Sequence, residues 1–171
     1  IHLSRLFGAG LVFACDLSDW RLGKALDMGA SDTINPSAEN AVEKLRHLNH
    51  GRRADVVIMT VPAVTALEQA FALAETGATI HMNAPPPPDH RMSFNPSDMY
   101  DRELELTTKY SADHNDIYQL FRLFEAKRLE PQKAITHRFE LEGISEAFAL
   151  LLKGNESLKS VIYPNGINTS G

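Results

Sequence analysis

Cysteine is nearly missing from this 171-residue chain, which has Cys15 alone, so an internal disulfide is excluded. No segment approaches the roughly 20 apolar residues of a membrane span, and the first residues lack the cationic region and cleavage site of a secretory signal. Positive charge is not in excess, because the formal net charge is −5 and the pI about 5.8, which leaves no basic stripe for nucleic acid. With 43% hydrophobic residues, the composition favours a cytoplasmic globular protein without membrane or nucleic-acid partners.

A glycine-rich phosphate loop is also missing, since no G-x-G-x-x-G occurs in the chain. The nearest candidate is Gly8-Ala9-Gly10, with Phe13 at the place of the third glycine. The motif needs a strand before it and a helix after it, whereas these glycines follow a predicted helix over residues 1–7 and lead into a strand. We interpret them as a helix-to-strand connection, and we expect the chain to begin inside a domain.

No metal-binding pattern emerges from the histidines and the cysteine. His47 and His50 are three residues apart near a helix end, but a third ligand is not nearby, so we expect both to be solvated. His137 is interpreted as a structural hydrogen-bonding residue. Cys15 lies in a predicted buried strand and is expected to be a packed thiol. The sequence therefore predicts neither a metal site nor a catalytic residue in this chain.

What the chain does contain is an acid at the end of a hydrophobic run. Residues 11–15 are apolar, Asp16 closes the run, and Ser18 is placed to cap a helix that extends to Met28. This order is typical of the second half of a dinucleotide-binding βαβ unit, where the carboxylate accepts both hydroxyls of an adenosine ribose. The alternative is that Asp16 only caps the helix that follows it.

Strands and helices alternate along the chain, which predicts an α/β fold with a Rossmann-type, doubly wound parallel sheet. Ala54–Thr60 has the continuous apolar character of a buried parallel strand, Gly77 is expected to cap the helix before it, and Pro85–Pro88 predicts an extended loop. Strands are predicted at 12–16, 31–35, 54–60, 78–82, 104–110, 136–139 and 159–163, and helices at 20–28, 39–48, 64–75, 117–125 and 141–152. In the strand order 3-2-1-4-5-6 the first strand is central. We therefore expect an upstream segment, from the same polypeptide or another copy, between strands 12–16 and 54–60.

Three groups of residues make the chain resemble a known family. These are RLFGAG, VFACD and LSDWRLGKALDMGA at the front, TGATIHMNAPPP in the middle, and ITHRFELEGISEAFALLLKG with LKSVIYP at the end. In this order and spacing they resemble the coenzyme-binding half of zinc-dependent medium-chain alcohol or polyol dehydrogenases. The segment around Tyr110 is most similar to the sorbitol and threonine dehydrogenase branch. The resemblance implies a hydride transfer between NAD and a secondary alcohol or polyol, with zinc ligands that lie upstream of this chain.

The resemblance also implies a domain organisation and an assembly. Residues 1–125 would form the NAD-binding domain, 126–164 a segment that packs toward a catalytic domain, and 165–171 a disordered tail. The strand Leu104–Tyr110 would be the last of its sheet, and exposed edges invite pairing. A homodimer or homotetramer through this strand is therefore expected, and the chain alone is expected to be inactive.

The family's coenzyme contacts transfer to this chain where positions match. Asp16 is similar to the acid that accepts the ribose hydroxyls. Arg21 is similar to the basic residue beside that ribose, and the alternative is that it is an ordinary exposed charge on the helix. The other matches are Thr60 and Val61 at the adenosine end, Met82, Ala84, Thr108 and Tyr110 along the nicotinamide, and Lys159 near the pyrophosphate. Met82 and Tyr110 also read as core residues, and Lys159 as a surface lysine. The chain has Pro62 and Asn83 where the family commonly has glycine.

Two functions from other classes compete with this interpretation. A non-catalytic nucleotide-sensing Rossmann domain would bind the same ligand, but would have no use for the segment ITHRFELEGISEAF. A methyltransferase also holds a ribose with an acid at the end of its second strand, but its sheet usually ends in an antiparallel hairpin, for which the sequence gives no clear signal.

Overall fold

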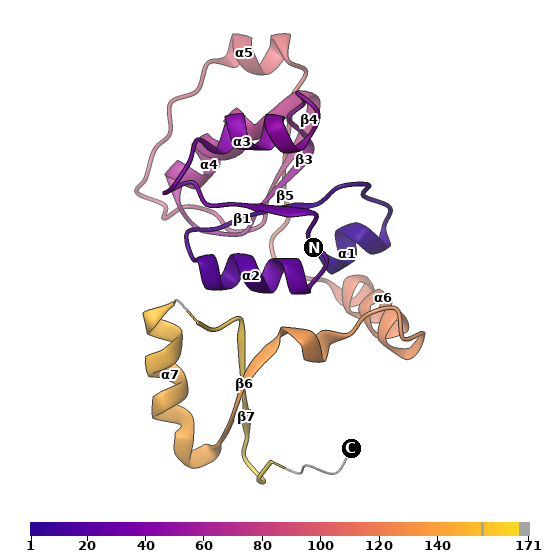
Figure 1. Ribbon diagram of the computed structural model, residues 1–171, viewed down its shortest axis with the longest axis vertical. Helices are drawn as coiled ribbons and strands as arrows, with labels where there is room; N and C mark the ends of the chain where they lie inside the picture. Colours follow the sequence, from indigo (N-terminus) through magenta and orange to yellow (C-terminus); the bar gives the residue numbers. More distant parts are fainter. Residues whose placement is uncertain (155, 168–171) are drawn as a thin grey trace. The chain divides into compact units, whose positions relative to one another are not determined.

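The computed structural model describes residues 1–154 and 156–167 and confirms a parallel α/β fold (Figure 1). The chain divides into two compact units, the first made of residues 1–38 with the chain from residue 118 onward, and the second of residues 39–117. We call them unit 1 and unit 2. Three sheets form among the described residues, with orders β1-β2, β3-β4-β5 and β6-β7, and every strand pair in them is parallel. The division at residues 125 and 164 stays a prediction.

The first part of unit 1 follows the sequence pattern closely. Its elements are α1 (His2–Leu6), β1 (Phe13–Cys15), α2 (Asp19–Asp27) and β2 (Asp32–Ile34). Ser18 is the N-cap of α2, as predicted, because its side chain accepts the backbone N–H of Arg21 at 3.3 Å. The buried face of α2 carries Leu22 and Ala25. β1 and β2 are in register from Phe13 opposite Asp32 to Cys15 opposite Ile34.

Gly8-Ala9-Gly10 connects α1 to β1, as predicted, and is not a phosphate loop. The Arg5 guanidinium holds this connection: it donates to the carbonyl of Gly10, to the carbonyl of Gly29 at 3.0 Å and to the Ser31 hydroxyl at 2.8 Å. The backbone N–H groups of Gly8 and Ala9, which a phosphate loop would offer to its ligand, donate instead to the carbonyls of Arg5 and Ser4 at 3.1 and 2.9 Å.

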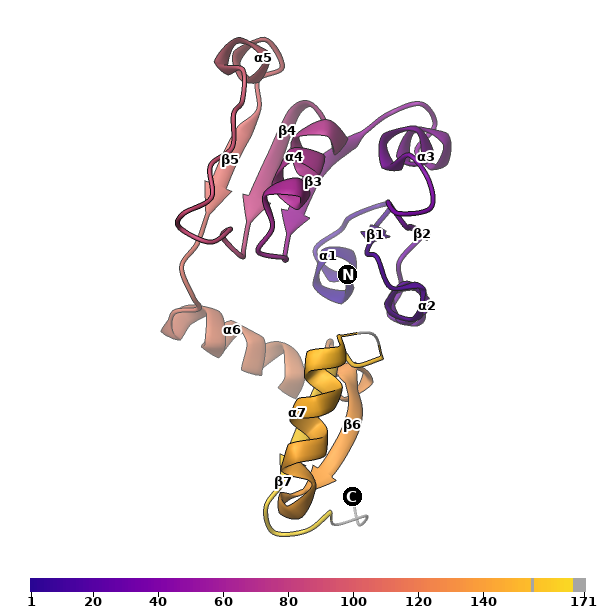
Figure 2. The ribbon, with the colours of Figure 1, turned by 90° about the vertical axis from the view of Figure 1, so that its left-hand side faces the viewer.

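The second part of unit 1 is a small parallel βαβ arrangement. The helices and strands that follow β5 along the chain are α6 (His114–Glu125), η1 (Pro131–Ala134), β6 (Ile135–Glu140), η2 (Leu141–Gly143), α7 (Ile144–Lys153) and β7 (Lys159–Tyr163). α6 begins in the last residues of unit 2. α7 lies against the β6–β7 pair (Figure 2) and ends at Gly154, whose φ of 69° is the left-handed conformation that glycine adopts readily. Of the predicted tail at 165–171, residues 168–171 lie outside the described residues.

Unit 2 is a three-stranded sheet with one helix packed on it. Its elements are α3 (Ala41–Leu48), β3 (Ala54–Met59), α4 (Val64–Leu73), β4 (Ala74–Met82), α5 (Pro96–Asp101) and β5 (Glu105–Thr108). β3, β4 and β5 run in one direction, with α4 in front of β3 and β4 (Figure 2). The core consists of apolar residues from α4, from β4 and from the position directly before β5: Ala70, Ala74, Ala78, Ile80 and Leu104. β5 is the edge strand, as predicted.

The boundary between α4 and β4 differs from the prediction. The helix was expected to reach Glu75 with Gly77 as its cap, but α4 ends at Leu73 and Gly77 lies inside β4 with a φ of 77°. The guanidinium of Arg102 donates to the carbonyls of Phe71 and Ala74 and so satisfies the end of the helix from a distant position. β4 is irregular here, and its register with β3 shifts between Ala54 and Val56.

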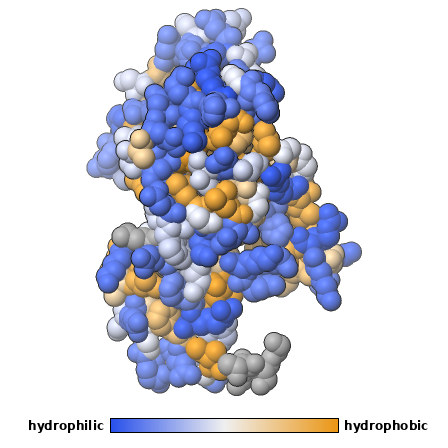
Figure 3. Space-filling view, viewed as in Figure 1, coloured by the Kyte–Doolittle hydropathy of each residue, from blue (hydrophilic) through white to orange (hydrophobic). Residues whose placement is uncertain are grey.

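Two strands are less buried than expected. Cys15 was predicted to be a packed thiol, which is wrong, because it is exposed at the end of β1. Ala54–Thr60 was predicted to be a buried strand, yet Val56 and Ile58 on β3 are 59% and 54% exposed. Within the described residues β1 has β2 as its one strand partner and β3 has β4, so each keeps an open edge. Figure 3 shows hydrophobic residues among the hydrophilic surface.

The loop after β4 has more structure than predicted. The extended segment with four prolines is irregular, but a short helix, α5, follows it, because Asn95 accepts the N–H of Ser97 at 3.0 Å and Pro96 occupies the first turn. Among residues 1–154 and 156–167, every helix is too short or too polar to cross a bilayer.

Candidate functional site

The acid that closes β1 is held in a defined position. Asp16 continues the β1–β2 ladder, with its N–H bonded to the carbonyl of Ile34 at 3.2 Å. Its carboxylate oxygen Oδ1 accepts the N–H of Ser18 at 2.9 Å and the Nε–H of Arg21 at 3.0 Å. Each of these bonds uses Oδ1. The second oxygen, Oδ2, makes no hydrogen bond to a described residue and remains a strong acceptor for a hydroxyl pair.

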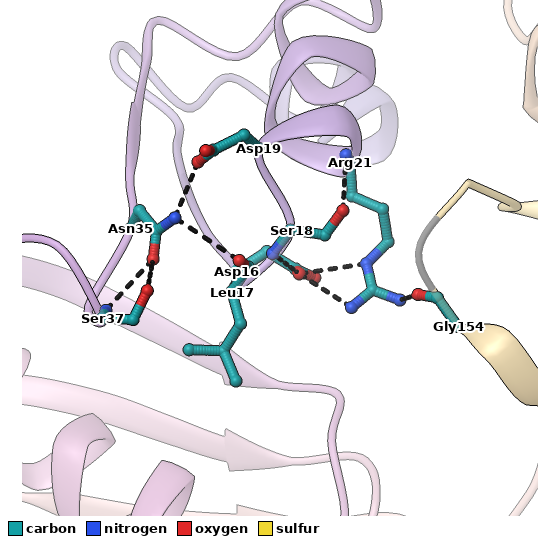
Figure 4. Close-up of polar contacts among 8 residues, drawn as sticks. All are labelled: Asp16, Leu17, Ser18, Asp19, Arg21, Asn35, Ser37 and Gly154. Carbon is teal, nitrogen blue, oxygen red and sulfur yellow. Dashed lines mark hydrogen bonds and ion pairs between the residues drawn. The ribbon is translucent and has the colours of Figure 1, made fainter.

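Arg21 binds the same carboxylate and also reaches the C-terminal part of unit 1. Its Nη2 lies 2.9 Å from Oδ1 of Asp16, and the two side chains are about one-third exposed. Its Nη1 donates to the carbonyl of Gly154 (Figure 4). The structure thus brings the predicted pair Asp16 and Arg21 together, and it shows that Ser18, not Asp16, is the helix cap.

A second polar network lies beside this pair and was missed in the sequence. Asn35, just after β2, donates to the Asp19 carboxylate at 2.6 Å, and its own carbonyl oxygen accepts from the hydroxyl of Ser37 at 2.6 Å (Figure 4). The available signal was the pair Asn35-Pro36 after a short strand, which marks a turn but does not name a partner. The network holds the carboxylate of Asp19, the first residue of α2, on the side chain of Asn35.

A hollow of about 170 Å³ in unit 1 is lined by Asp16 and Arg21. The rest of its lining includes the apolar residues Ala14, Leu22 and Leu158. Cys15 also lines it, and its pKa is raised, first because part of the thiol's hydration is lost and second because the Asp16 carboxylate is adjacent. An apolar wall with one acidic end suits a ligand that carries hydroxyl groups on a flat, partly apolar body.

Lys159 is not part of this cluster. It is the exposed first residue of β7, its carbonyl accepts from the Thr136 hydroxyl at 3.4 Å, and its ammonium makes no ion pair with a described residue. Leu158, directly before it, does line the hollow with Asp16. The structure therefore places Leu158, the neighbour of Lys159, near the acid, without placing the Lys159 ammonium there.

The six remaining predicted residues meet at one edge of the unit 2 sheet. Because β3, β4 and β5 are parallel, their carboxyl ends lie together, with Met59 opposite Met82 and Met82 opposite Thr108. The N–H of Asn83 donates to the carbonyl of Met59 at 2.9 Å. We call this the strand-end edge, and its predicted members are Thr60, Val61, Met82, Ala84, Thr108 and Tyr110.

The side chains of the strand-end edge are mostly exposed. Val61 is 47% exposed and Tyr110 is fully exposed, so the alternative interpretation of Tyr110 as a core residue is wrong. Met82 is half-buried. The backbone register, rather than contacts between side chains, brings these residues together. Within the part of the chain that the structure describes, no group of three His, Cys, Asp or Glu residues is placed to hold a metal ion.

Comparison with known proteins gives consistent results. A family model described as zinc-binding dehydrogenase matches residues 1–126. The chain is 31% identical over 169 residues to the L-threonine 3-dehydrogenase of Symbiobacterium thermophilum and 27% identical over 177 residues to the sorbitol dehydrogenase of Bacillus subtilis, covering 96% of this chain in both cases. It covers 47% and 46% of those relatives, so the chain spans about half their length.

The fold has the same counterpart among solved structures. A protein of Sinorhizobium meliloti, described as a zinc-binding dehydrogenase and solved bound to NADP, superposes with a TM-score of 0.84 at 22% identity. The superposition covers 96% of this chain and 48% of that protein. At this level of identity the likeness establishes the fold.

Proposed function

The chain belongs to the zinc-binding dehydrogenase family, and we propose that it is the coenzyme-binding part of an NAD-dependent dehydrogenase. The reaction would move a hydride between NAD(H) and a secondary alcohol or polyol. The observation that carries this proposal is the carboxylate of Asp16 at the end of β1, held through one oxygen by Ser18 and Arg21 while the other stays available.

The residues of this chain would bind and orient the coenzyme. Asp16 would accept the hydroxyls of the adenosine ribose through Oδ2, and the hollow beside it would receive the apolar face of that end. Thr60 and Val61 would contact the adenosine end, and the other members of the strand-end edge would contact the nicotinamide and its carboxamide. Lys159 would approach the pyrophosphate. When bound, NAD supplies the ring carbon that accepts the hydride.

The coenzyme would be NAD rather than NADP. The 2′-phosphate of NADP carries about −1.5 to −2 charges at neutral pH, and it would meet the Asp16 carboxylate, with a second acid, Asp19, three residues further along the chain. Asn35 holds the Asp19 side chain at 2.6 Å, so this second negative charge is fixed in place. The Sinorhizobium meliloti protein is bound to NADP, but the choice in this chain rests on its own two acids.

The names of two relatives, an L-threonine 3-dehydrogenase and a sorbitol dehydrogenase, support the proposed substrate class. Both names describe enzymes that act on an alcohol group, and this supports a secondary alcohol or polyol as the substrate. In the complete enzyme a zinc ion would polarise the alcohol oxygen. A cytoplasmic location belongs to the same proposal, because a hydride-transfer enzyme of this kind draws on the soluble coenzyme pool.

A ligand titration separates this function from its two rivals. The purified protein would be titrated with NADH, NADPH and S-adenosylhomocysteine, with the fluorescence of the single tryptophan, Trp20 on α2, as the readout. The proposal is supported if the protein is saturated at a much lower concentration of NADH than of NADPH and if the methyl-donor analogue does not bind. Binding of S-adenosylhomocysteine alone would identify a methyltransferase. Tight NADH binding by a complete polypeptide without dehydrogenase activity would identify a sensor.

Zinc gives a separate prediction. The single cysteine and the dispersed histidines offer no set of three ligands with an open position, as a catalytic zinc needs. We expect elemental analysis of this chain to find no stoichiometric zinc, and we expect no dehydrogenase activity from it alone. About one tightly bound zinc per chain would contradict this.

The assembly would be a homodimer or homotetramer. β5 is the edge of its sheet in the described part of the chain, and residues 105–108 are all exposed. An edge strand presents unpaired N–H and C=O groups that a second copy can pair with. Light scattering at micromolar concentration should report at least a dimer, and a monomer with the chain intact would count against it.

A further inference from the structure

One side chain joins two segments of unit 1 that are 133 residues apart. The guanidinium of Arg21 places Nε and Nη2 on Oδ1 of Asp16, at 3.0 and 2.9 Å, and directs Nη1 to the carbonyl of Gly154. Figure 4 shows Arg21 between the two partners, with Asp16 on one side and Gly154 on the other. Arg21 therefore connects the acid of β1 with the C-terminal segment.

The Gly154 carbonyl is a suitable partner for a cation. Gly154 is the C-cap of α7, and the C-terminal end of a helix carries a partial negative charge from its unsatisfied carbonyls. A bond from a guanidinium to such a carbonyl is charge-assisted. The planar fork of arginine can serve the carboxylate and the carbonyl together, whereas a lysine ammonium is a point charge without the fork's geometry.

A residue shortly after Gly154 lines the same hollow as the acid. Leu158, four residues after Gly154, lines the hollow together with Asp16 and Arg21. Its N–H is bonded to the Thr136 hydroxyl at 3.1 Å, and β7 starts at the next residue. The position of Leu158, directly before β7, thus sets one wall of the space beside Asp16.

We propose that Arg21 is a positioning residue of the coenzyme site: it occupies Oδ1 of Asp16, which leaves Oδ2 for the ribose, and through the same guanidinium it ties Gly154, the C-cap of α7, to that carboxylate. This inference rests on the proposed function. It differs from a direct contact between Arg21 and the ribose, because the side chain acts here through Asp16 and Gly154. It also differs from a general stabilising role, because its effect would be confined to the two segments.

The test compares Arg21→Lys and Arg21→Met with the control variants Arg46→Lys and Arg46→Met. Arg46 lies on helix α3, is about half exposed and faces Glu43 at 4.0 Å. Hydrogen exchange of the ligand-free protein would be followed in peptides covering residues 150–160, and the NADH dissociation constant would be measured by titration. We expect faster exchange in these peptides for both Arg21 variants and NADH binding weakened about tenfold, the range of a partly exposed charge-assisted bond. The Arg46 variants should leave both quantities unchanged.

The remaining outcomes separate the alternatives. Weaker NADH binding with unchanged exchange in residues 150–160 would make Arg21 a direct contact and overturn the tie. Wild-type behaviour of Arg21→Lys in both measurements would also overturn it, because the fork would then be unnecessary. Faster exchange throughout α2 and β6 would show a general structural role and overturn it as well. The wild-type protein could bind neither NADH nor NADPH while the Arg21 variants still show faster exchange in residues 150–160. The proposed function would then fail, but the link that Arg21 makes between Asp16 and Gly154 would be supported.

Discussion

The acid site in unit 1 and the strand-end edge in unit 2 are built in opposite ways. The acid site, formed by Asp16, Arg21 and their neighbours, is held by bonds between side chains, and its groups are charged and about one-third exposed. The strand-end edge is held by strand register, and its side chains are largely exposed. Recognition by charge thus requires fixed side chains, whereas a wall along a flat ligand requires only a fixed backbone.

The largest expected effect is a loss of stability when a side chain is removed from the core of the sheet that carries the strand-end edge. Ile80 is fully buried in β4, opposite Val57 and Leu106. Ile80→Ala should lower the free energy of unfolding by about 2–4 kcal/mol, because it leaves a cavity in the core. Urea unfolding would measure this.

Ile58→Ala is the matched control, because Ile58 on the neighbouring strand is 54% exposed. It should cost less than about 1 kcal/mol. Equal losses for the two variants would mean that the sheet is not organised by the face that α4 covers.

The next effect concerns the acid site, where function should change and stability should not. Asp16→Ser should weaken NAD binding by about 1.5–3 kcal/mol, the range for hydrogen bonds to charged groups, and raise the relative use of NADP. The loss of the partly exposed ion pair with Arg21 should cost at most about 1 kcal/mol of stability.

Asp27→Ser at the end of α2 is the control for this change, since Asp27 is exposed and pairs with Lys24 alone among the described residues. In coenzyme titrations, the Asp27→Ser variant should bind NAD and NADP with the same affinities as the wild-type protein. If the preference between NAD and NADP is the same before and after Asp16→Ser, Asp16 does not select the coenzyme. Its role would then be limited to its bonds with Ser18 and Arg21.

The smallest expected effect is on the chemistry of Cys15. Loss of hydration and the adjacent Asp16 carboxylate raise the pKa of its thiol, so less thiolate is present at neutral pH than in an ordinary cysteine. Alkylation by iodoacetamide should therefore be slow at pH 7.5 and faster as the pH rises. Asp16→Asn removes one of the two causes, which lowers the pKa of Cys15, and should speed the reaction at pH 7.5. An unchanged rate would show that Asp16 does not act on the thiol.

Local signals were sufficient for most of the fold. Ser18 before a periodic segment predicted the start of α2, and the range predicted for β7 matches the structure. The end of α4 was not predictable, because the group that satisfies its last carbonyls is Arg102, which lies 28 residues beyond Ala74. The exposure of Val56, Ile58 and Cys15 was not predictable either, because an apolar run does not reveal how many neighbours a strand has.

The candidate site, like the fold, could be predicted only in part from the sequence. An apolar strand closed by an acid pointed to Asp16, and parallel strands imply that their carboxyl ends meet. The partner of Arg21 could not be found in the sequence, because the Lys-Gly pair at the end of α7 predicts a left-handed cap but not the side chain that binds its carbonyl. The bond between Asn35 and Asp19 was hidden for the same reason.

The proposed function requires that the acid site bind the adenosine end of a nicotinamide coenzyme and that the strand-end edge bind the other end. Amide NMR shifts in titrations with adenosine monophosphate and with NADH test it most directly. We predict that adenosine monophosphate shifts the amides of residues 16–21 and leaves those of Met82 and Thr108 unchanged, while NADH shifts both groups. NADH shifts confined to one group, or adenosine monophosphate shifts at Met82 and Thr108 without any at residues 16–21, would contradict the claim.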